Sequence, residues 1–132
     1  MIELNYVAIL LATVASMLIG AVWYSKYVFG PSWMKLVDLD EKKAKEGMLP
    51  AMTGSVVLVF IMNYVLAHFL IFLNAQTWNE ALILGLWIWL GFIATNSLSN
   101  VLYTHKPIKL WFIDSGYRLV EILVSVMIIS SL

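Results

Sequence analysis

Three ionisable residues, Asp114, Arg118 and Glu121, interrupt a long apolar stretch near the end of the chain. Their spacings of four and three, continued by Ser125, return to one side of an α-helix. Ionisable side chains at membrane depth are costly, so they usually face a protein interior or water. Such a stripe could line a path for a proton, ion or small polar solute, or it could hold helices together through hydrogen bonds. The sequence leaves both interpretations open.

The preceding apolar stretch carries a second polar set, Asn96, Asn100 and Tyr103, which share one face of a helix. A short loop at 104–108 joins the two stretches, so we expect antiparallel neighbours. At about 1.5 Å per residue, Asn100 then lies near the level of Asp114, and Asn96 near that of Arg118. We therefore predict one intramembrane polar cluster between these two helices, in which Arg118 bonds both carboxylates of its own stripe.

The composition identifies the class of protein. Hydrophobic residues make up 62% of the chain and charged residues only 12%, about half the share usual in soluble domains. This composition predicts an integral membrane protein whose surroundings are the lipid bilayer. The formal net charge is zero, so nothing suggests a nucleic-acid partner.

No catalytic or metal-binding set is evident. The chain has no cysteine, which excludes disulfides, thiolate metal sites and cysteine nucleophiles. It has no HExxH, no GxSxG with a plausible histidine partner, and no phosphate-binding glycine loop. His68 is expected near the outer end of the second stretch and His105 at the inner end of the third, so they cannot share a metal ion. We expect no enzyme, no cofactor and no metal site.

Each of four segments is long enough to cross a hydrocarbon core, which takes about 20 apolar residues. None shows the alternation of a membrane β-strand. The predicted fold is therefore all-α: one integral membrane domain over 1–132, built as a four-helix transmembrane bundle. The predicted spans are 6–24, 49–73, 81–103 and 109–132.

The loops predict the orientation. Lysines occur only between the first and second spans and around the loop that joins the third and fourth. The positive-inside rule then places both of these loops in the cytoplasm and both termini outside.

The segment after the first span predicts a short helix lying in the plane of the membrane interface. Gly30 and Pro31 end the membrane helix and can open a new one, whose apolar side chains recur at helical spacing. Aromatic residues are enriched at membrane–water interfaces. Four of them are expected to anchor this interface: Trp23, Tyr24, Tyr27 and Trp33.

The first span has a small residue at every fourth position: Ala8, Ala12, Ser16 and Gly20. Small-residue ladders let membrane helices approach closely, so this face should pack against a neighbour in the same subunit or in a second one. We expect Gly20 and Ser16 to accept alanine, which preserves close approach, but not leucine.

Several motifs along the chain resemble a family of small prokaryotic membrane proteins catalogued as domain of unknown function 1761. They are 20–25 (GAVWYS), 29–30 (FG), 33–34 (WM), 89–92 (WLGF), 106–107 (KP) and 113–120 (IDSGYRLV). Lys26 departs from the pattern, which has proline there in many members. The resemblance implies four helices and a prokaryotic inner membrane, but no activity.

Two functional hypotheses follow from the sequence. The first is a small homo-oligomeric channel or carrier that uses the intramembrane polar cluster, because one small bundle has little interior of its own. The second is an accessory subunit or assembly factor of a larger membrane complex, which would dock through the ladder and the aromatic residues.

Overall fold

The computed structural model describes residues 3–132, and these form α-helices, one π-helical turn and short connections, with no strand among them. The elements in chain order are α1 (Tyr6–Trp23), α2 (Gly30–Leu36), α3 (Glu41–Glu46), α4 (Met48–Phe72), α5 (Trp78–Ile88), η1 (Trp89–Ala94), α6 (Thr95–Tyr103) and α7 (Ile108–Ser131). The all-α prediction is confirmed, and the long helices begin and end close to the predicted spans. The helix expected after the first span is α2.

Local sequence signals explain where the helices begin. The side chain of Asn5 accepts a hydrogen bond from the backbone of Ala8 at 3.1 Å and caps α1. Thr77 and Glu80 form a reciprocal capping box at the start of α5. The tight turns before α5 and α7 contain Asn74 and His105, whose φ angles of 54° and 56° reverse the chain.

Three helical stretches are long and apolar enough to cross a membrane: Tyr6–Trp23, Met48–Phe72 and Trp78–Tyr103, the last formed by α5, η1 and α6 together. The fourth predicted span corresponds to α7, which has 24 residues. This helix is long enough, but it contains Lys109, Asp114, Arg118 and Glu121 and is not among the three.

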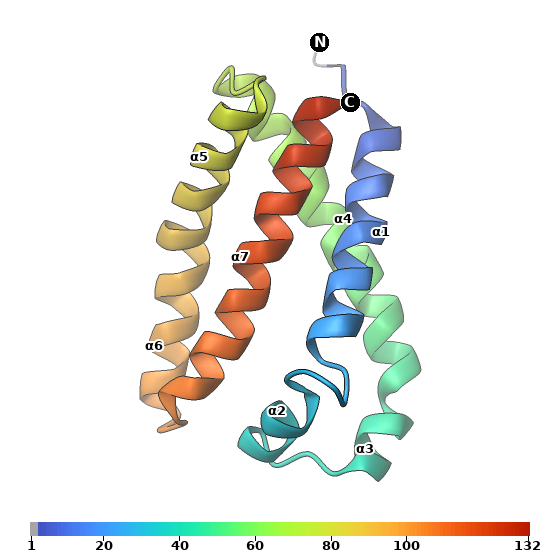
Figure 1. The fold of residues 1–132 in the computed structure, drawn as a ribbon, viewed down its shortest axis with the longest axis vertical. Helices are drawn as coiled ribbons and strands as arrows, with labels where there is room; N and C mark the ends of the chain where they lie inside the picture. Colours follow the sequence, from blue (N-terminus) through green and yellow to red (C-terminus); the bar gives the residue numbers. More distant parts are fainter. Residues whose placement is uncertain (1–2) are drawn as a thin grey trace.

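α7 lies at the centre of the molecule (Figure 1). It packs against α1 on one side and against α5 and α6 on the other, and α4 crosses it. The start of α1 and the end of α7 lie at the same end of the molecule, and α2 and α3 lie at the opposite end. α4 also packs directly against α1, so α7 is the main link between this pair and the α5–α6 stretch.

The apolar core is concentrated towards the end where the termini lie. Its buried residues come from α4, the turn after it, α5 and α7: Leu66, Leu70, Ala75, Ala81, Ile122 and Val126. The first half of α4, residues 48–58, contributes no buried residue. α4 therefore covers α7 near the termini and leaves the other end of α7 uncovered on that side (Figure 1).

The stretch from α5 to α6 contains the π-helical turn η1. A π-turn inserts one residue relative to an α-helix and rotates the faces that follow it. The residues facing α7 before the turn are Ala81 and Gly85, and after it they are Ala94 and Val101. The face presented to α7 is thus shifted by the turn.

Candidate functional site

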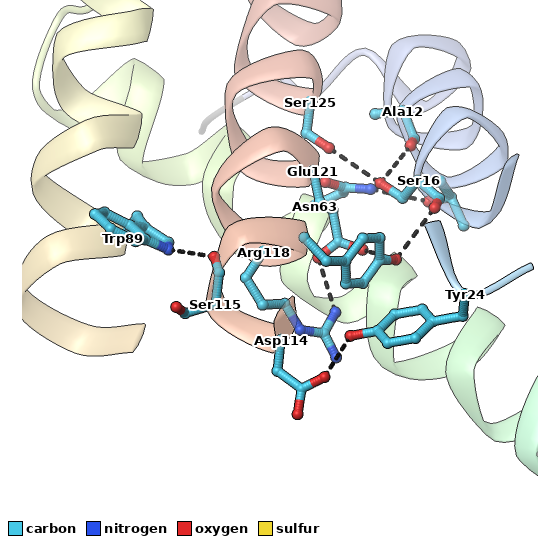
Figure 2. Close-up of polar contacts among 12 residues, drawn as sticks. Ala12, Ser16, Tyr24, Asn63, Trp89, Asp114, Ser115, Arg118, Glu121 and Ser125 are labelled. Atoms are coloured by element: carbon cyan, nitrogen blue, oxygen red, sulfur yellow. Dashed lines mark hydrogen bonds and ion pairs between the residues drawn. The ribbon is translucent and has the colours of Figure 1, made fainter. Parts of the chain in front are cut away.

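Glu121 on α7 is bonded by two side chains of its own helix, Tyr117 and Arg118 (Figure 2). The Glu121 side chain is completely buried. Its Oε1 accepts a hydrogen bond from Arg118 Nη1 at 2.8 Å, and its Oε2 accepts one from the Tyr117 hydroxyl at 2.6 Å. The Arg118 side chain is 46% exposed, so the carboxylate of this ion pair is buried and the guanidinium group is partly exposed.

Asp114, one turn before Arg118, has a different partner. It accepts a hydrogen bond of 2.6 Å from the hydroxyl of Tyr24, the residue that follows α1. The structure thus corrects the prediction that Arg118 bonds both carboxylates: among the described residues, its ion pair is with Glu121 alone. The rings of Tyr24 and Tyr117 lie edge to face with centroids 5.5 Å apart, which connects the two carboxyl groups through aromatic side chains.

Further along α7, small polar side chains continue the line into the interior. The Tyr117 hydroxyl also lies 3.1 Å from the backbone oxygen of Ser16, and the hydroxyls of Ser16 and Ser125 are 3.3 Å apart. Between α4 and α1, Asn63 Nδ2 donates a hydrogen bond to Thr13 Oγ1 at 3.3 Å. Asn63 is fully buried, and among residues 3–132 its Oδ1 finds no hydrogen-bond partner.

We call this line of side chains the α7 polar column. Its members are Thr13, Ser16, Tyr24, Asn63, Asp114, Tyr117, Arg118, Glu121 and Ser125. It begins beside α2 and ends past the middle of α7 (Figures 1 and 2). Beyond it, towards the termini, the buried residues are apolar and include Ile9, Leu66 and Val126.

Two tryptophans attach neighbouring elements to the backbone of α7. Trp89 Nε1 donates to the Ser115 oxygen at 2.7 Å, and Trp23 Nε1 donates to the Ile113 oxygen at 2.9 Å. A Cβ at Gly116 would lie 3.3 Å from the Trp23 ring, so glycine there allows the ring to lie close to α7. These contacts hold in place the turn of α7 that carries Asp114.

The structure contradicts the part of the predicted cluster that came from the third span. Asn96, Asn100 and Tyr103 are exposed on the side of α6 away from α7. The sequence argument assumed an uninterrupted α-helix, whereas the π-turn η1 rotates α6 so that Ala94 and Val101 face α7 instead. The polar column is therefore built from α1, α4 and α7 and not from α6.

The small-residue ladder of α1 lies on a packed face. Ala8, Ala12 and Ser16 are buried, and Gly20 lies against α7. A Cβ at Gly20 would be 3.0 Å from the Tyr117 hydroxyl oxygen. Alanine therefore has less space at this position than we predicted from the sequence.

The four predicted interface anchors differ in their exposure. Tyr27 is 84% exposed, but Trp23, Tyr24 and Trp33 are partly buried. Trp23 and Tyr24 bond to α7, and Trp33 packs edge to face on Tyr24 with ring centroids 5.5 Å apart. Three of these aromatic residues are therefore contacts within the molecule, because the chain after α1 folds back towards α7.

Tyr117 and Asn63 were not part of the predicted polar cluster. Tyr117 lies four residues before Glu121, so the helical spacing that grouped the charged residues could have included it. Nothing in the sequence indicated that Asn63 would meet Thr13, because that contact depends on how α1 and α4 cross. Within residues 3–132, no group of three or more His, Asp or Glu side chains is placed to hold a metal ion.

A family model described as a protein of unknown function, DUF1761, matches residues 7–130. No curated protein and no solved structure matches the chain. The match covers almost all of the chain, including every helix of the polar column. The chain belongs to the DUF1761 family.

Proposed function

We propose that this protein is an integral membrane protein of the prokaryotic inner membrane, in which α1, α4, the α5–α6 stretch and α7 all cross the bilayer. Three of these stretches have the length and hydropathy for it. Both termini lie outside and both lysine-containing loops lie in the cytoplasm, as the positive-inside rule requires. The arrangement of α2 and α3 at the end opposite the termini supports this topology.

The contacts of the charged residues support a membrane position for α7. Glu121 is sealed from the surroundings and paired with Arg118, and Asp114 is bonded to Tyr24. Lys109 lies in the first turn of α7, where its side chain can reach the interface. A charged helix can cross a bilayer when its ionisable groups pair within the protein.

We propose that the α7 polar column makes the protein a carrier for a proton or small cation. The observation that supports this most directly is the hydrogen count around Tyr117. Its hydroxyl has one hydrogen but lies within bonding distance of two acceptors, Glu121 Oε2 and the Ser16 oxygen. A proton on Glu121 Oε2 would supply the missing hydrogen and complete both bonds, while Oε1 still accepts from Arg118.

The shape of the column favours a carrier over a channel. One end of the column is open, since the Arg118 side chain is 46% exposed. Its other end stops at buried apolar residues such as Ile9 and Val126. A bound proton or cation could therefore enter from the cytoplasm, and release to the other side would require the helices to move. No catalytic or cofactor role is part of this proposal.

The test is flux through liposomes that contain the purified protein. A potassium diffusion potential drives uptake, and a pH-sensitive dye and a labelled monovalent cation report proton and cation movement. We expect flux with the wild type and with Glu46→Gln, a matched change of an exposed acid on α3. We expect loss of flux with Glu121→Gln.

A second variant separates folding from transport. Arg118→Met leaves a buried carboxylate without its cation, whereas Asp114→Leu, Arg118→Met, Glu121→Leu removes the whole group, and such replacements can be neutral for stability. The proposal expects this triple variant to fold and to carry no flux. If wild type and triple variant fold equally and neither shows flux, the column is a structural element and the carrier proposal is wrong.

A second candidate function is an accessory subunit or assembly factor of a larger membrane complex. The exposed polar face of α6 is the surface through which it could bind another protein. Purification in mild detergent distinguishes the two: stoichiometric foreign partners support the accessory role, and a pure protein of defined size supports the carrier.

A further inference from the structure

The outer face of α6 carries a set of exposed polar side chains. Asn96, Ser99, Asn100 and Tyr103 are all exposed, and Tyr103 is 85% exposed. These positions have the spacing i, i+3, i+4 and i+7, which forms one straight seam along a helix. They lie on the side opposite Ala94 and Val101, the residues that face α7. We call this set the α6 seam.

The α6 seam belongs to the stretch Trp78–Tyr103, which is the least buried of the three apolar stretches, at 17% against 28% for each of the others. If this stretch crosses the membrane, as proposed above, its two amide side chains face lipid in the isolated protomer. An amide without a hydrogen-bond partner is costly in hydrocarbon, so such side chains normally bond across a helix–helix interface.

We infer that the α6 seam is the interface between two copies of this chain. Each amide offers both a donor and an acceptor, so Asn96 and Asn100 can bond reciprocally to the same residues of a second copy. The seam contains no charged residue, so two identical faces do not repel each other. Ser99 lies between the two amides, and its small side chain allows the helices to approach closely.

The same surface could bind a different membrane protein, but its character favours a second copy. A heterologous partner would need to supply a matching set of donors and acceptors, whereas an identical seam related by a two-fold axis supplies it by symmetry. The α7 polar column lies on the other side of α6, so dimer formation leaves the column within each protomer.

The absence of cysteine allows a direct test. Ser99→Cys introduces a thiol of similar size in the centre of the seam, and Thr53→Cys introduces one on the exposed first half of α4 as a matched control. In native membranes treated with an oxidant, we expect Ser99→Cys to give a disulfide-linked dimer and Thr53→Cys to give at least about tenfold less. Equal cross-linking of both, or none, would overturn the inference.

A second pair of variants tests the amides themselves. Asn96→Leu combined with Asn100→Leu should weaken dimerisation in detergent by about tenfold or more, because interhelical hydrogen bonds each contribute modestly. Thr53→Leu should leave dimerisation unchanged. A double-leucine variant that folds and dimerises like the wild type would contradict the inference, as would a foreign protein replacing the second copy on the seam.

The inferred dimer interface depends on the proposal that the α5–α6 stretch crosses the membrane. Separate experiments can refute membrane crossing and the interface. Alkaline extraction of membranes first establishes whether the wild type is integral. Extraction into the soluble fraction would refute membrane crossing and remove the argument for the seam. An integral protein that shows no Ser99→Cys cross-link would refute the seam alone.

Discussion

The contact between Gly20 and Tyr117 offers a sharp test of how α1 is held against the polar column. An alanine Cβ at Gly20 would lie 3.0 Å from the Tyr117 hydroxyl oxygen and 3.2 Å from its Cζ. That hydroxyl cannot move away freely, because it lies 2.6 Å from Glu121 and 3.1 Å from the Ser16 oxygen. Gly20→Ala must therefore either strain the packing or lengthen a hydrogen bond to a buried carboxylate.

Overpacking of a filled interior typically costs about 1–3 kcal/mol, and we expect Gly20→Ala to fall in that range. Tyr117→Phe removes a hydrogen bond to a charged group, which is usually worth about 1.5–3 kcal/mol. In the Tyr117→Phe background the oxygen is gone and only the ring contacts of 3.2 and 3.4 Å remain. Gly20→Ala should then cost less, and the two changes should be coupled by about 1 kcal/mol.

The assay is equilibrium unfolding in mixed lipid–detergent micelles, followed by helix content, for the two single variants and the double variant. Gly54→Ala is the control for the helix preference of alanine, since nothing lies within 4 Å of a Cβ there. It should be neutral or stabilising. If Gly20→Ala behaves like Gly54→Ala, or if the two changes are strictly additive, the packing argument is wrong.

Two further predictions concern topology and the attachment of η1. A reporter that is active only in the cytoplasm should work when inserted near Ala44 and be silent when fused after Leu132, and the reverse pattern would overturn the proposed orientation. Trp89→Phe removes the 2.7 Å bond to the Ser115 oxygen and should lower the free energy of unfolding by about 1 kcal/mol. Trp87→Phe, a change at a residue that is 66% exposed, should have little effect, and equal effects of the two would argue against the bond.

The sequence predicted the helices well because each long apolar stretch carries its own signal. Length, hydropathy and turn residues are local, so the bounds of α1 and α4 were within one residue of the predicted 6–24 and 49–73. The one-sided stripe of α7 was also local information, and it correctly grouped Glu121 with Arg118.

The contacts between helices could not be predicted in the same way. The π-turn η1 has no signature in a single sequence, yet it rotates α6 and removes Asn96 and Asn100 from the predicted cluster. Likewise, nothing local showed that the chain after α1 turns back so that Tyr24 reaches Asp114. Both errors come from rotations and bends that depend on tertiary packing.

The position of α7 explains why this helix is less apolar than the other three stretches. It has eight buried residues, whereas α1 and α4 have five each. A helix that faces protein on several sides needs little contact with lipid, so it can carry Asp114, Arg118 and Glu121 where partners are available. A helix at the edge offers fewer partners of this kind, and Asn96 and Asn100 on the outer face of α6 are exposed. The two polar sets of this chain thus have different physical meanings: the one on α7 lies at the centre of the molecule, and the one on α6 lies on its outer surface, where we infer the contact with a second copy.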